Sequence, residues 1–69
     1  MNLLEARHDL MIRKAAIDFI KMVKANPGFS HHYPKDLENL ATTDDFILIA
    51  NMCKAAGLKL NSRKTGWEV

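Results

Sequence analysis

The sequence predicts one domain, mainly α-helical, that ends in a small β-hairpin. Apolar residues recur three and four positions apart along residues 3–25 and again along 42–57, which is the spacing of one helix face. Residues 58–60 and 67–69 instead alternate apolar and polar side chains, as a strand does, around a turn-forming stretch at 61–66. The chain has 69 residues, so we expect a single domain, residues 1–69, with one small core.

The first element is a long helix over residues 3–25, in an N-terminal segment that ends at residue 26. Asn26-Pro27-Gly28 stops it, because proline cannot continue a helix and glycine frees the turn. The stripe that we expect to be buried is Ile12, Ala16, Phe19 and Val23.

A second apolar line on this helix consists of Leu3, Leu10 and Ile17, seven residues apart. Two interpretations stay open. The line is either a set of scattered surface residues or a helix–helix seam, and a seam would make the protein a homodimer through its N-terminal helix.

The middle of the chain predicts an extended piece and two further helices, the helices lying within residues 34–57. Pro34 opens a short helix that runs through Ala41, with Leu37, Leu40 and Ala41 facing inward. Thr42 and Asp45 have the spacing of a capping box, and Gly57 stands where a left-handed C-cap is favoured. Residues expected on the inward face of this third helix are Phe46, Ile49, Cys53 and Ala56.

Residues 58–69 predict the hairpin. The side chains expected on its core face are Leu58, Leu60, Trp67 and Val69. Arg63 and Lys64 fall in the turn at its tip, where they are equally consistent with a solvated turn and with a contact to phosphate.

This order of elements resembles the winged helix–turn–helix family over about residues 12–69. The likeness is carried by Ala25-Asn-Pro-Gly28, Pro34-Lys-Asp-Leu-Glu-Asn-Leu-Ala41, Lys54-Ala-Ala-Gly-Leu58 and the wing-like end Lys59-Leu-Asn-Ser-Arg-Lys-Thr-Gly-Trp-Glu-Val69. The resemblance implies a three-helix, winged-helix-like domain that binds duplex DNA, with the third helix in the major groove and the wing on phosphates.

On that reading the protein is a small DNA-binding regulator of transcription. Asn51 and Lys54 would enter the groove, with Asn51 able to read adenine, and Lys59, Arg63 and Lys64 would grip phosphates. The ends of the chain support it, since residues 58–69 hold three basic and one acidic side chain.

The alternative is a winged-helix-like adaptor or inhibitor that binds a protein and not DNA. It rests on the acidic middle, because residues 27–57 hold two basic and four acidic side chains, and on Ile47 and Leu48, which we expect to be exposed on the third helix. DNA binding would weaken steeply with salt, and that separates the two hypotheses.

Other classes of function find little support. No phosphate-binding glycine loop or His-Glu-x-x-His motif is present, so we expect neither an enzyme nor a cofactor. Adjacent His31 and His32 cannot easily face one ion, and Cys53 falls on an inward stripe as an inert thiol. The charged N-terminus predicts no signal peptide, and with one cysteine and no long apolar run we expect a cytoplasmic protein with no membrane contact.

Overall fold

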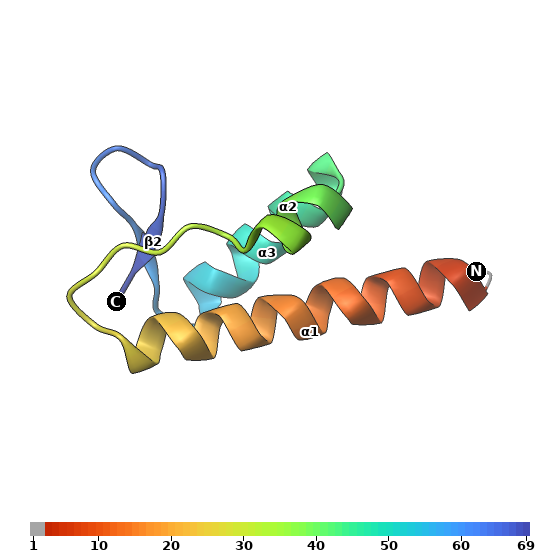
Figure 1. Cartoon of the computed structure of the whole chain (residues 1–69), viewed down its shortest axis with the longest axis horizontal. Helices are drawn as coiled ribbons and strands as arrows, with labels where there is room; N and C mark the ends of the chain where they lie inside the picture. The colour runs from red at the N-terminus through yellow and green to blue at the C-terminus, as the bar shows by residue number, and fades with distance from the viewer. Residues whose placement is uncertain (1–2) are drawn as a thin grey trace.

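A computed structural model describes residues 3–69 and confirms a mainly α-helical chain with a small antiparallel hairpin (Figure 1). Its elements are α1 Leu3–Ala25, α2 Lys35–Leu40, α3 Thr43–Ala55, β1 Lys59–Leu60 and β2 Trp67–Glu68. Among these residues, no helix combines the length and the apolar character that crossing a bilayer requires.

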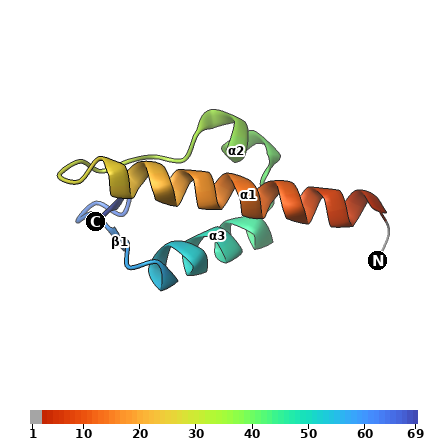
Figure 2. The same cartoon turned by 90° about the horizontal axis from the view of Figure 1, so that it is seen from below.

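The long helix α1 sets the shape of the molecule, whose largest dimension is 40 Å against 21 and 20 Å for the other two. Figure 2 shows α2 along one edge of α1 and α3 along the other. In both views the N-terminal end of α1 projects beyond the other two helices. The hairpin lies at the opposite end of α1 (Figure 1).

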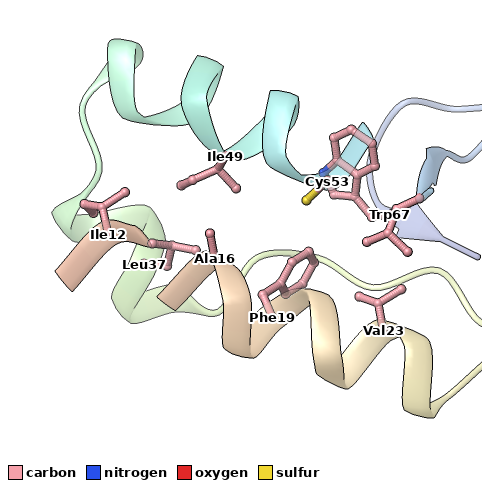
Figure 3. Close-up of a cluster of buried hydrophobic side chains, with 9 residues drawn as sticks. Ile12, Ala16, Phe19, Val23, Leu37, Ile49, Cys53 and Trp67 are labelled. Atoms are coloured by element: carbon pink, nitrogen blue, oxygen red, sulfur yellow. The ribbon is translucent and has the colours of Figure 1, made fainter. Parts of the chain in front are cut away.

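One hydrophobic core joins α1 to the remaining elements (Figure 3). The stripe expected on α1 is buried in full, with exposed fractions between 0 and 2%. The core is made of Ile12, Ala16, Phe19, Val23, Leu37, Ile49, Cys53, Leu58 and Trp67. Burial of Trp67 therefore confirms that the hairpin packs on the helices.

Local hydrogen bonds fix both ends of α3. The predicted capping box is present: the backbone N–H of Asp45 donates to Thr42 Oγ1 at 3.2 Å, and that of Thr42 donates to Asp45 Oδ2 at 2.9 Å. At the other end Gly57 has φ 89°, in the left-handed region that favours glycine. The N–H of Leu58 then reaches the Cys53 carbonyl at 3.0 Å, which turns the chain directly into the hairpin.

The segment between α1 and α2 adds to the hairpin as a single strand-like residue. His31 and Trp67 exchange two backbone hydrogen bonds of 2.8 Å, beside the β1–β2 pairing of Leu60 with Trp67. Gly66 makes this approach possible, because a Cβ there would lie 3.0 Å from the His31 carbonyl oxygen. An extended segment packed on a two-stranded hairpin is compatible with a winged-helix-like arrangement.

The prediction that three further side chains lie in the core is wrong. Leu40, Leu60 and Val69 are 49, 39 and 54% exposed. Helix α2 has only six residues, so Leu37 alone reaches the core. Leu58 and Trp67 fill the core at this end of the chain, which leaves Leu60 and Val69 outside it.

Candidate functional site

A groove runs between α3 and the hairpin, and we call it the α3–hairpin groove. Its volume is about 400 Å³ and its lining is mostly apolar. The residues that line it are His31, His32, Tyr33, Thr43, Phe46, Ile47, Ala50, Leu60, Lys64, Thr65, Gly66 and Trp67. Three separate segments of the chain thus form one concave surface.

Tyr33 holds the walls of this groove in place. Its ring packs between Phe19 and Phe46, with ring centres 5.2 and 5.7 Å away. Its hydroxyl accepts a hydrogen bond of 2.8 Å from the Trp67 indole N–H, which joins the connecting segment to the hairpin. Burial raises the pKa of the Tyr33 hydroxyl, so this group is neutral at physiological pH.

The start of α3 is tied to α1 by a side-chain contact. His8 Nε2 lies 2.8 Å from Asp45 Oδ2. The backbone N–H of Thr42 and the hydrogen bond with His8 hold the pKa of Asp45 below its usual range. Asp45 is therefore engaged with α1 and with its own helix end, and Asp44 is the exposed acid at the start of α3.

Hydrogen bonds also shape the tip of the hairpin. The Thr65 N–H donates to Asn61 Oδ1 at 2.9 Å, and the Asn61 side-chain amide donates to Thr65 Oγ1 at 3.1 Å. Lys64 takes a left-handed backbone with φ 57°, and its N–H donates to the Asn61 carbonyl at 3.0 Å. The turn therefore has a defined conformation and presents Arg63 and Lys64 to solvent.

The residues suggested for DNA contact are all exposed, and most of them do not line the groove. They are Asn51, Lys54, Lys59, Arg63 and Lys64. Lys64 is the one among them that lines the groove. Lys54 follows Ile47 and Ala50 by seven and four residues, so it continues their row on α3.

The residues suggested for protein contact lie on separate surfaces of the molecule. Ile47 lines the groove and is 57% exposed. Leu48 is half-buried on another side of α3 and does not line it. Leu3, Leu10 and Ile17 are exposed on α1, away from the groove.

Several lining residues were not expected to face a shared surface, among them Thr43, Ala50 and Leu60. Leu60 reads as a core residue because it alternates with Leu58. The groove depends on the pairing of His31 with Trp67, two residues with no shared local pattern. One signal was available: Tyr33, an aromatic residue before Pro34, indicated that this segment is anchored.

Nucleophile and metal chemistry gain no support from the geometry. Cys53 is buried, and burial raises the pKa of its thiol to about 11. The reactive thiolate is therefore scarce at physiological pH. In the part of the chain that the structure describes, no group of three or more His, Cys, Asp or Glu side chains could hold a metal ion.

Comparison with protein-family models, with curated proteins and with solved structures found no match for this chain. What the groove can bind is consequently inferred from its shape, its apolar lining and the charges at its edge.

Proposed function

We propose that this chain is a winged-helix-like adaptor that binds an acidic amphipathic segment of another protein in the α3–hairpin groove. The observation that carries this proposal is the apolar surface left open between two walls. Ile47 on α3 and Leu60 on β1 are 57 and 39% exposed and line the same groove. Large apolar side chains gathered in a concave surface are typical of a site that a partner covers.

The charges at the edge favour an acidic partner. Lys64 lines the groove at the hairpin tip, Arg63 is next to it, and Lys54 continues the row of Ile47 on α3. Carboxylates that flank an apolar ridge on the partner would face these cations. A helix with apolar residues three or four apart and acidic residues beside them has the required pattern.

A second candidate is a DNA-binding regulator that uses the exposed polar and basic side chains of α3 and the hairpin. It is favoured by the exposure of Asn51, Lys54, Lys59, Arg63 and Lys64. The ion pairs within the described residues are His8–Asp45 and Arg13–Asp9. The cations of α3 and the hairpin, namely Lys54, Lys59, Arg63 and Lys64, are thus open for phosphate. The contact of Asp45 with α1 also moves one acid away from a DNA-facing surface.

We place the protein partner first because of what DNA would meet between the cations. Ile47 and Leu60 gain little from a phosphate backbone, whereas an apolar side chain of a partner would remove both from water. A fully exposed side chain of this kind contributes about 1.5–3 kcal/mol on complete burial. Ile47 and Leu60, which are 57 and 39% exposed, would contribute a corresponding part of that.

The first experiment selects twelve-residue peptides from a displayed random library against the wild-type chain. We expect enrichment of peptides with two apolar residues three or four apart and an excess of Asp and Glu. Binding should be lost with Ile47→Glu and retained with Leu40→Glu, a matched control 49% exposed on α2 and absent from the groove lining. Peptides that bind Ile47→Glu as well as the wild type would contradict the proposal.

The second experiment decides between the two candidates. A mobility-shift titration on mixed-sequence duplex DNA is run at low and at moderate salt. The adaptor proposal predicts no shift at moderate salt, whereas a DNA-binding protein would give a shift that weakens steeply as salt rises. A sequence-dependent shift that survives moderate salt would reverse the order of the two candidates.

A further inference from the structure

The N-terminal part of α1 projects beyond α2 and α3 (Figures 1 and 2). In this overhang Leu3 and Leu4 are 78 and 77% exposed, and Met11, farther along the same helix, is 46% exposed. We propose that this overhang docks on a second copy of the chain, in an antiparallel two-fold pairing of two α1 helices. The inference does not rest on the proposed function and involves none of the residues that line the α3–hairpin groove.

The surface that receives the overhang is a second groove, between α1 and α2. Its volume is about 310 Å³ and its floor is mostly apolar. It is lined by Ala15, Asp18, Phe19, Met22, Pro34, Asp36 and Leu37. Two carboxylates, those of Asp18 and Asp36, thus stand beside an apolar surface that fits the apolar overhang of another copy.

The overhang and this groove share one side of α1, which we call the α1 flank. Leu4, Met11, Ala15 and Met22 are seven, four and seven residues apart and so form one row along the helix. Arg7, three residues after Leu4 and four before Met11, borders the N-terminal half of the α1 flank, and the C-terminal half of the flank borders the groove. A two-fold antiparallel pairing brings each half against the other half of the partner helix.

The charges match in this arrangement. With Arg7 opposite the partner's Asp18, Leu3 and Leu4 lie beside the partner's Met22 at the apolar groove. Symmetry repeats this ion pair, so two Arg–Asp pairs close the seam. Both side chains are exposed in the single chain, and the ion pairs within its described residues use neither of them.

The neighbouring line Leu3, Leu10 and Ile17 is a less favourable seam. It is also exposed, at 78, 67 and 44%. Arg7, Lys14 and Lys21 run beside it at the same seven-residue spacing. An antiparallel pair centred on this line would bring that row of cations against its own copy.

Sedimentation equilibrium of the full chain tests the inference. We expect a dimer for the wild type and a dimer dissociation constant raised at least about tenfold by Met11→Glu. Ile17→Glu is the matched control, since Ile17 is 44% exposed against 46% for Met11 but lies off the α1 flank, and it should leave the dimer intact. Circular dichroism checks that each variant is folded.

Charge exchange tests the register of the pairing. Arg7→Asp and Asp18→Arg should each weaken the dimer by about tenfold, because two attractive pairs become repulsive. The double variant should restore most of the affinity. A wild type that stays monomeric at millimolar concentration overturns the inference. So does a dimer that Ile17→Glu weakens as much as Met11→Glu, or one that the double exchange fails to restore.

Discussion

Trp67 is the residue whose removal should damage the fold most. It is 3% exposed, its indole N–H donates to the Tyr33 hydroxyl at 2.8 Å, and its backbone pairs with both His31 and β1. Replacement of a buried tryptophan by alanine costs about 3–5 kcal/mol. A chain of 69 residues has about 3–10 kcal/mol of stability in all. We therefore expect Trp67→Ala to unfold largely or to lie close to its unfolding midpoint.

Urea denaturation followed by far-UV circular dichroism measures this effect without relying on tryptophan fluorescence. Trp67→Phe separates the ring from its hydrogen bond: it keeps an aromatic side chain but leaves the half-buried Tyr33 hydroxyl without its donor, at a cost of about 1–3 kcal/mol. The double variant with Tyr33→Phe should recover part of that loss. A Trp67→Ala variant within about 1 kcal/mol of the wild type would refute a hairpin packed on the core.

Three further experiments test the groove, the start of α3 and the hairpin tip. Gly66→Ala should cost about 1–3 kcal/mol, measured by urea denaturation, because its Cβ would crowd a backbone carbonyl at 3.0 Å. Asp45 has a folded pKa below its ordinary value of 3.8, so its stabilising contribution is present above that value and is lost as pH falls through the folded pKa. Asp45→Asn should therefore lower the thermal midpoint at neutral pH and flatten its decline in acid, while the control Asp44→Asn changes either little. If DNA is the ligand, Arg63→Ala with Lys64→Ala should reduce the salt slope of binding by about one to two units, and an unchanged slope would make the tip a solvated turn.

Helix ends could be predicted from the sequence because their signals are local. Thr42 and Asp45 satisfy each other's backbone groups within one turn, and Gly57 needs a left-handed backbone that other residues adopt at a cost. The buried stripe of α1 follows from its spacing alone. This prediction was correct because the helix is long and the spacing of its apolar residues is sustained along it.

Core membership at the ends of the chain could not be predicted in the same way. Leu60 alternates with Leu58 but is 39% exposed, because Leu58 fills the core whereas Leu60 lines the open α3–hairpin groove. Leu40 is likewise outside the core, because the short helix α2 buries a single leucine. The spacing of apolar residues indicates which side chains share a face of a helix or strand. The length of that helix or strand limits how many of them reach the core.

The sequence predicted the exposure of single residues at the candidate site, but it did not predict that they form one groove. Exposure of Lys54, Lys59 and Arg63 followed from their places on an outward helix face, at an alternating strand position and in a turn. That Ile47 would share a groove with Leu60 depends on contacts between segments far apart in the chain, chiefly the bridge of His31 to Trp67. Such pairings are set by tertiary packing and leave no periodic signal.

Binding of an acidic segment in the α3–hairpin groove is tested most directly by locating a bound peptide on the protein. An acidic amphipathic peptide from the selection is titrated into the isotope-labelled chain, and backbone amide shifts are followed by nuclear magnetic resonance. If the peptide binds in the α3–hairpin groove, the shifts should concentrate on its two walls, at Thr43, Ile47, Ala50, Leu60 and Thr65. Shifts confined to α1 and α2, with those walls unchanged, would contradict it.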